Sequence, residues 1–297
     1  AIGRRLHVPG AFDVVPMANG LISVVGVRCN EDCPIVNTPM RQLTELFPDL
    51  SITVVGIIRN DKGVLPSSRD SMLPGDDVYF VCDSNHVSRA MAAFGHEEEE
   101  GRTVIIAGGG NIGLTLAEEI EQEHEGVRSR LIEFDDKRAR AVAQQLEQTM
   151  VLNGDVLDLE ILEEAHGANT ETFVAVSNDD EVTIIGSLLA KRAGAKRTIA
   201  LINKHSYGQL ITTLGIDAVV NPRVITVSSI LQHVRRGRIR GIYSVREDFG
   251  EVIEAEALET SVLVNRSLKE SKLPKGVIVG AIVRDEEVIA PRGGTVI

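Results

Sequence analysis

The sequence predicts an α/β fold in which a doubly wound parallel sheet is flanked by two small α+β domains. Two observations lead to this prediction. Between residues 102 and 236, short β-branched apolar segments alternate with amphipathic helical segments, which is the rhythm of βαβ units. On either side the chain is richer in short strands and turns, and these two flanks resemble each other. Self-similarity over such a distance indicates a duplicated domain.

The flanks match in two places. "VNTPMRQLT" at residues 36–44 compares with "VNRSLKESK" at 264–272, and "VVGIIRNDKGVLP" at 54–66 compares with "IVGAIVRDEEVIAP" at 278–291. The first copy continues into a further strand at 78–81, whereas the second stops at Ile297. We therefore expect the second copy to be incomplete at its end.

Domain boundaries follow from the repeat and from one charge run. We expect the first small domain at 21–94 and the second at 241–297, with the nucleotide-binding domain at 102–236. Residues 95–101 contain four consecutive glutamates between glycines, which predicts a solvated linker. Residues 1–20 lie directly before the first copy of the repeat, and the end of the central nucleotide-binding domain lies directly before the second copy. They are therefore expected to be the C-terminal remnant of another nucleotide-binding domain, in a fragment of a longer tandem protein.

The central region opens with a buried strand at 103–107 that runs into Gly108-Gly109-Gly110-Asn111-Ile112-Gly113. This segment satisfies G-x-G-x-x-G, the phosphate-binding turn of a Rossmann-like fold. Gly108 would allow the tight turn, Gly110 the approach of a pyrophosphate, and Gly113 close packing of helix on strand. The following helix places Ile112, Leu116 and Ile120 on one face, and its N-terminus offers free N–H groups to phosphates.

A carboxylate stands at the end of the next predicted strand. Arg130 to Glu133 forms that strand, and Glu133 lies 20 residues after Gly113. A carboxylate at this position binds ribose hydroxyls and repels a 2′-phosphate, which favours NAD(H) or an adenosine nucleotide over NADP(H). Arg138, close behind, works against that preference. The alternative for Glu133 is a solvated strand end.

The βαβ rhythm then continues to the end of the region. Further strands are predicted at 150–152, 173–176, 198–202 and 218–220. Helices between and after them carry apolar faces, formed by Ala139, Val142, Ala143 and Leu146, by Val182, Ile185 and Leu189, and by Val224, Val227, Leu231 and Val234. Asn221 and Pro222 are expected to cap the last helix. Ligands bind beyond the carboxyl ends of such strands, where the sequence places Glu133, Asp155, Ser177, Asn178 and Asn203.

Composition excludes several classes of protein. A formal net charge of −12 argues against nucleic acid as a general partner. No apolar run approaches the roughly 20 residues that span a bilayer. Three cysteines without an export signal fit a reduced, cytoplasmic protein. Cys29 and Cys33 offer two metal ligands, but a structural zinc needs four and no second pair lies at suitable spacing, so no metal site is predicted.

With these residues identified, the chain resembles the RCK/KTN family, the regulators of potassium conductance found in Trk/Ktr-type potassium uptake systems. The resemblance runs through "VIIAGGGNIG", "LIEFD", "NGDVLD", "AVSNDDEV", "IALINK" and "VVNPR", which lie between residues 103 and 223. It extends to the two flanks, which resemble RCK-C domains. A tandem arrangement of N and C domains, known in this family, would explain the duplication.

The resemblance implies a site and a role. Gly108, Gly110, Asn111, Ile112 and Gly113 would bind phosphates, Glu133 the adenosine ribose, Asp155 would lie near the adenine, and Ser177 and Asn178 near the phosphates or second ribose. The ligands implied are NAD(H), with ATP and ADP as competing regulatory ligands. The implied partner is a membrane-embedded, TrkH/KtrB-like potassium channel subunit. The protein would be a cytoplasmic homo-oligomer, from dimer to tetrameric ring, peripheral on the inner face of the membrane.

Two other functions are weighed on the residues. An NAD-dependent oxidoreductase needs an acid/base group beside the nicotinamide. Lys204 and His205 are its best candidates, although a polar loop at a helix start explains them equally well. A redox-sensing repressor would need a basic DNA-reading helix, and the arginines at 235, 236, 238 and 240 form the one basic cluster. The sequence therefore favours a non-catalytic nucleotide sensor.

Overall fold

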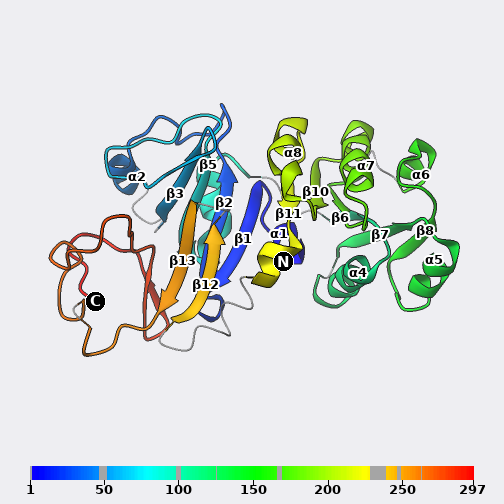
Figure 1. Cartoon of the computed structure of the whole chain (residues 1–297). Coiled ribbons are helices and arrows are strands. Elements are labelled where there is room, and N and C mark those ends of the chain that lie inside the picture. The colour runs from blue at the N-terminus through cyan, green and yellow to red at the C-terminus, as the bar shows by residue number, and fades with distance from the viewer. Residues whose placement is uncertain are drawn as a thin grey trace. The chain divides into compact units, whose positions relative to one another are not determined.

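A computed structural model of the 297-residue chain describes residues 2–46, 52–97, 102–124, 126–165, 169–227, 239–245, 249–261 and 263–297. The chain divides into two compact units (Figure 1). Unit 1 contains residues 1–7 and 99–225, and unit 2 contains residues 8–98 and 226–297.

Unit 1 is built on a six-stranded parallel sheet. Its strands are β6 (Thr103–Ala107), β7 (Arg128–Glu133), β8 (Met150–Asn153), β9 (Thr172–Ala175), β10 (Arg197–Leu201) and β11 (Ala218–Val220). They lie in the order β11-β10-β9-β6-β7-β8, and every pairing is parallel. Numbered along the chain and read from the other edge, this is 3-2-1-4-5-6, the strand order of a dinucleotide-binding sheet. The predicted Rossmann-like fold is confirmed.

Helices cover both faces of this sheet (Figure 1). On one side lie α4 (Asn111–Glu123) and α5 (Asp136–Ala143), and on the other α6 (Leu159–Glu164), α7 (Asp180–Ala193) and α8 (Gly208–Leu214). The unit also contains the short helices α1 (Ile2–Leu6) and η4 (His205–Tyr207). Strand residues are buried on both faces because both are covered. Ile105 and Phe173, for example, pack with Leu162 of α6 and Ala190 of α7.

Unit 2 contains a five-stranded antiparallel sheet in the order β1-β2-β5-β3-β4. The strands are β1 (Ala11–Met17), β2 (Ile22–Arg28), β3 (Thr53–Arg59), β4 (Lys62–Val64) and β5 (Asp77–Asp83). The helices are η1 (Ala18–Gly20), α2 (Met40–Leu46), η2 (Ser84–His86) and α3 (Val87–Ala93). Phe80 of β5 stacks on Phe94, with ring centroids 5.0 Å apart, in the core beside α3. The expected boundary at residue 20 falls between β1 and its partner β2.

The second part of unit 2 forms two hairpins. These pair β12 (Ile239–Val245) with β13 (Gly250–Ala255), and β14 (Ile282–Arg284) with β15 (Glu287–Ile289). Their apolar residues share one cluster with the five-stranded sheet: Tyr79 and Val81 pack with Val245, Phe249 and Val288. The ring of Phe249 lies where a side chain at Gly56 or Gly63 would stand. The two copies of the repeat therefore share a core.

The repeat seen in the sequence has a backbone counterpart. Asn60 and Asp61 join β3 to β4, Asp285 and Glu286 join β14 to β15, and all four residues have positive φ, as a two-residue type I′ hairpin turn requires. Asn37 and Asn265 likewise have φ of 62° and 61°. Isolated bridges also recur, Pro39 with Ser71 and Ser267 with Val296. Both flanks therefore adopt the same local turns at matched positions.

Some predicted helical faces differ in the structure. Ile112 is 44% exposed, whereas Leu116 and Ile120 of the same face are buried, because Ile112 lies in the first turn of α4, beyond the strand ends. Ile185 is 48% exposed, and α7 instead buries smaller residues such as Thr183, Ser187 and Ala190. The final helix is described over 222–227, so the predicted stripe at Leu231 and Val234 lies outside the described residues.

Candidate nucleotide-binding site

The glycine turn after β6 is shaped by close backbone approaches. Gly108 has φ of +112°, and its N–H donates to the carbonyl of Ile132 over 2.8 Å. A Cβ at Gly113 would lie 1.9 Å from the carbonyl oxygen of Gly108. Only glycine therefore lets α4 begin so close to the turn, as predicted from the fingerprint.

Gly110 differs from both of these glycines. It is the N-cap of α4, with φ of −65° and ψ of −172°, and has no side chain to cap the helix. A Cβ built on it would meet no heavy atom within 4 Å in the described structure. The first turn of α4 also lacks acidic residues. The helix N-terminus is therefore open to an anion.

Glu133 and Arg138 hold the central glycine of the turn from two sides. Gly109 donates its N–H to Glu133 Oε2 over 2.6 Å, and its carbonyl accepts from Arg138 Nε, also over 2.6 Å. The second oxygen of Glu133 accepts from the N–H of Asp135 over 2.9 Å. The carboxylate is therefore fixed beside the turn rather than solvated as a free strand end. Arg138 Nη2 is buried and, within the described chain, has no hydrogen-bond partner.

The other predicted residues lie along the same edge, because all six strands point the same way. Ser177 follows β9, and its backbone nitrogen would lie 3.1 Å from a Cβ at Gly108. Its hydroxyl accepts from the N–H of Asp179 over 3.2 Å. Asn178 is exposed beside it. Asp155, also exposed, follows β8 and accepts the N–H of Leu157 over 2.9 Å. The structure thus places Ser177, the glycines, Glu133 and Asp155 in that order along the edge.

Asn203 follows β10, further along the edge, and its side chain is engaged by Asp180. The backbone and side-chain nitrogens of Asn203 donate to Asp180 Oδ1 over 3.0 and 3.1 Å, and the N–H of Lys204 donates to Oδ2 over 2.8 Å. Burial alone would raise the pKa of Asp180, but these hydrogen bonds to its charged form outweigh that effect and lower it. Asn203 therefore has a structural role in tying β10 to α7.

Lys204, the best acid/base candidate in the sequence, is also engaged. Its Nζ lies 2.7 Å from Glu181 Oε1, which also accepts the hydroxyl of Tyr207 over 2.6 Å. The hydrogen bonds from Lys204 and Tyr207 lower the pKa of Glu181 to about 2, and Glu181 raises the pKa of Lys204. A lysine held in its charged form is a poor general base at neutral pH.

The cysteines lie in unit 2, and all three are buried. The hydrogen bond between Cys33 and Cys29 raises the pKa of Cys29 and lowers that of Cys33 to about 7. Burial raises the pKa of Cys82 to about 12. The groups of His, Cys, Asp and Glu close enough to hold a metal, among the described residues, include no cysteine.

Together these residues form a glycine turn with an open helix N-terminus and a fixed carboxylate next to it. Sequence reasoning found the glycines and Glu133 but missed the part played by Arg138, which lies beside the turn only because α5 folds back over β7. The nearest sequence signal was its position shortly after Glu133. Within the described residues, no helix is long and apolar enough to cross a bilayer.

Comparison with known proteins agrees with this architecture. The family model of the TrkA-N domain matches residues 104–222, and that of the TrkA-C domain matches residues 24–95 and 252–297. Trk system potassium uptake protein TrkA of Azorhizobium caulinodans is 49% identical over 99% of this chain, and that of Vibrio alginolyticus is 37% identical over 100%. The chain spans 64% and 65% of the lengths of these two relatives.

Solved structures share the fold at low sequence identity. The GsuK RCK domain superimposes with a TM-score of 0.57 at 15% sequence identity. The superposition covers 99% of this chain and 63% of the GsuK RCK domain chain. The GsuK channel bound to NAD superimposes with a TM-score of 0.56 at 14% sequence identity, over 99% of this chain and 53% of the channel chain. At these identities the likeness concerns the fold alone.

Proposed function

The chain belongs to the TrkA family, and on this premise we propose that it is a nucleotide-sensing regulatory subunit of a potassium uptake system. The observation that carries the proposal is the pairing of an open helix N-terminus at Gly110 with a carboxylate fixed at Glu133. The first feature suits phosphates and the second suits ribose hydroxyls.

The phosphates would bind at the N-terminus of α4. Gly110, Asn111, Ile112 and Gly113 present backbone N–H groups there, and Gly108 shapes the turn that aims them. Arg138 supports this placement, because a buried guanidinium nitrogen without a partner is costly unless an anion approaches it. Ser177 and Asn178, across the turn, would contact the phosphates or a second ribose.

The adenosine end would lie over β7 and β8. Glu133 is held by two backbone N–H groups, so its carboxylate is oriented before a ligand arrives, and Asp155 lies one strand further along the same edge. We infer that NAD(H) binds here and that ATP and ADP compete for the same site. A solved relative of the fold, the GsuK channel, has been described bound to NAD and to ADP.

We propose a switch rather than an enzyme. Lys204 is paired with Glu181 and so held in its charged form, which makes it a poor acid/base group. The side chain of His205, the other candidate, lies outside the described part of the structure. A nucleotide that binds two conformations of the protein unequally shifts the population between them by its difference in affinity. NADH and ATP differ in charge and size beyond the shared adenosine, which provides such a difference.

The readout would be potassium flux. We propose that the protein acts as a homo-oligomer, up to a tetrameric ring, on the cytoplasmic face of a membrane-embedded, TrkH/KtrB-like channel subunit. The naming of its relatives as Trk system potassium uptake proteins supports this partner.

Calorimetric titration tests the proposal. NADH, NAD, ADP and ATP are titrated into the wild type, Glu133→Ala, and the control Glu163→Ala, which alters an exposed glutamate on α6. Binding to the wild type and the control, with weakened binding to Glu133→Ala, supports the site. If no nucleotide binds the wild type, the proposal fails. Steady consumption of NADH with a small carbonyl compound would favour the oxidoreductase instead.

A further inference from the structure

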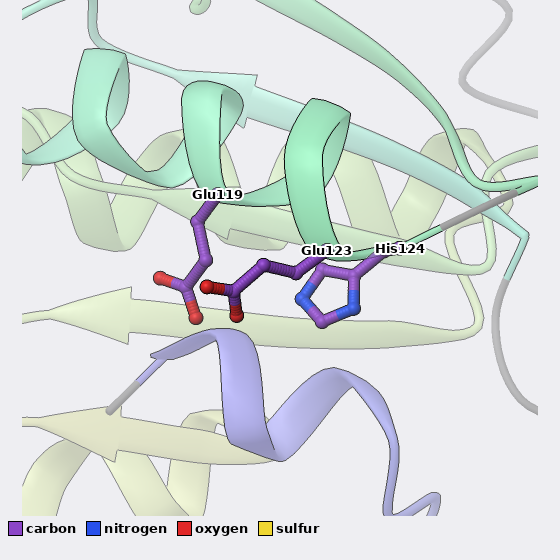
Figure 2. A group of neighbouring side chains, drawn as sticks. All are labelled: Glu119, Glu123 and His124. Carbon is purple, nitrogen blue, oxygen red and sulfur yellow. The ribbon is translucent and has the colours of Figure 1, made fainter.

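A second group of polar side chains lies at the opposite end of α4 from the glycine turn. Glu119 and Glu123 are one helical turn apart, and His124 directly follows the helix as its C-cap. Figure 2 shows these three side chains directed away from α4 toward the short helix α1. One potential ligand atom from each lies within 4.8 Å of the others. None of the three belongs to the predicted nucleotide site.

A second histidine joins the group from a distant part of the chain. His7 directly follows α1, and its Nε2 lies 3.4 Å from Nε2 of His124, with the ring centroids 4.2 Å apart and the planes tilted by 55°. Helix α1 is held in unit 1 by two further contacts. Arg5 Nη1 donates to the carbonyl of Val219 over 3.2 Å, and Arg197 Nη1 donates to the carbonyl of Arg5 over 2.5 Å.

The distance between the two histidine nitrogens has a chemical meaning. At 3.4 Å the two nitrogens lie beyond the range of about 2.7–3.2 Å that is typical of N–H···O hydrogen bonds, so any hydrogen bond between the rings is long. Two imidazole nitrogens that each lie about 2.0–2.1 Å from a tetrahedral zinc ion are about 3.3–3.4 Å apart. The histidines therefore stand at the separation of two ligands on one ion.

Helix α1 packs beside one of the two carboxylates. A Cβ at Gly3 would lie 2.1 Å from Glu119 Oε1, so the backbone of α1 passes close beside this carboxylate. Glu119 is therefore partly buried beside α1, while Glu123 is exposed and free to adjust its rotamer. Glu119, Glu123 and His124 thus offer ligand atoms within 4.8 Å of one another, and His7 adds a second imidazole that lies against His124. Two imidazoles from two segments are more than an acidic helix end alone would supply.

We propose that His7, Glu119, Glu123 and His124 bind a divalent transition-metal ion, with Zn²⁺ as the best fit. Two imidazole nitrogens and two carboxylate oxygens match the ligand preferences of Zn²⁺ and, after it, Co²⁺ and Ni²⁺. Imidazole ligands disfavour Mg²⁺ and Ca²⁺, which take oxygen. The ion would join α1 to the C-terminal end of α4, and so couple the segment before the first small domain to the nucleotide-binding fold.

The test measures metal binding by the whole chain. Zn²⁺ is titrated against a competing chelator into the wild type and into His7→Gln, Glu123→Gln and His124→Gln. Glu118→Gln, on the same helix but outside the cluster, and His86→Gln, in unit 2, are matched controls. Thermal unfolding with EDTA checks that each variant folds. Because Glu123 is exposed, Glu123→Gln retains the fold even if a histidine variant does not.

We expect one Zn²⁺ per wild-type chain and per control chain. Each ligand substitution should weaken binding by more than about 100-fold, the upper end of the cost of losing an outer-shell partner. Co²⁺ in the same site should show tetrahedral bands without thiolate charge transfer, because the cysteines are not ligands. The proposal is overturned if the wild type binds no Zn²⁺, if any of the three variants binds as the wild type does, or if the Co²⁺ spectrum shows thiolate ligation.

Discussion

Gly110→Ala separates the folding role of the glycine turn from its binding role. Position 110 has φ of −65° and ψ of −172°, which any L-residue adopts, and the added Cβ would meet no heavy atom within 4 Å. The free protein should therefore tolerate the methyl group. Replacing a glycine at a compatible position stabilises a protein by about 0.4–1 kcal/mol, because the unfolded chain loses freedom. Gly110 is also the N-cap of α4, where alanine is less favourable than glycine by a similar amount, so the two effects should nearly cancel. For a domain of this size, the melting temperature should therefore change by no more than about 4 °C in either direction.

Nucleotide binding should instead be clearly weakened. If a pyrophosphate approaches the backbone at Gly110, the methyl group occupies the space that the phosphate needs. Steric overpacking of this kind costs about 1–3 kcal/mol, which is about 5- to 160-fold in Kd. Differential scanning calorimetry measures the stability and isothermal titration with NADH or ATP measures the affinity, both on one preparation.

Gly294→Ala is the matched control, because its added Cβ also meets no atom within 4 Å and it lies in unit 2. It should change neither nucleotide affinity nor, by more than a few degrees, the melting temperature. If Gly110→Ala binds nucleotide as tightly as the wild type, the glycine turn is not where the phosphates bind. If instead the Gly110→Ala variant does not fold, the space beside Gly110 is not open to a methyl group.

Three further predictions follow from neighbouring contacts. Gly113→Ala places a Cβ 1.9 Å from the carbonyl of Gly108, so it should destabilise unit 1 by about 1–3 kcal/mol in urea unfolding; a wild-type stability would contradict the packing. Asp180→Asn should lower the free energy of unfolding at pH 7 by about 1–3 kcal/mol, because it weakens charge-assisted hydrogen bonds. Since folding lowers the pKa of Asp180 below 3.8, its stabilisation is complete above that pH and lost as the pH falls further, so the difference between wild type and variant should vanish in acid. Lys204→Met should raise the pKa of Glu181 from about 2 toward 4.5 in an NMR titration while leaving NADH affinity within about twofold; a large loss of affinity would show that Lys204 contributes to the binding site.

Local patterns were sufficient to predict the sheet and the glycine turn. The strand at 103–107 is a short β-branched run, and the glycines are dictated by contacts within a few residues of each other in the fold. Glu133 was found because the spacing between turn and carboxylate is fixed by one βαβ unit. The two flanks were recognised because their hairpin turns demand similar residues at positive φ, such as Asn60 and Asp61.

The features that sequence reasoning missed depend on contacts between distant segments. Arg138 reaches the carbonyl of Gly109 only because α5 packs against β7. The periodicity of apolar residues in a sequence cannot predict an individual side-chain hydrogen bond of this kind. The hydrogen bond from Asn203 to Asp180 joins residues 23 positions apart, and the local sequence gave no sign of it. His7 and His124 are separated by 117 residues, and the sequence around neither histidine predicts that their side chains are in contact.

The most direct test of the account is a competition experiment on the wild-type chain. NADH is bound to saturation, its fluorescence is followed while ATP is added, and the NADH concentration is assayed throughout. A sensor with one shared site predicts complete, competitive displacement of NADH by ATP, no consumption of NADH, and weakened binding of both ligands in Glu133→Gln. Simultaneous binding of NADH and ATP, or affinity for both that is unchanged in Glu133→Gln, would contradict a single nucleotide site built on the glycine turn and Glu133.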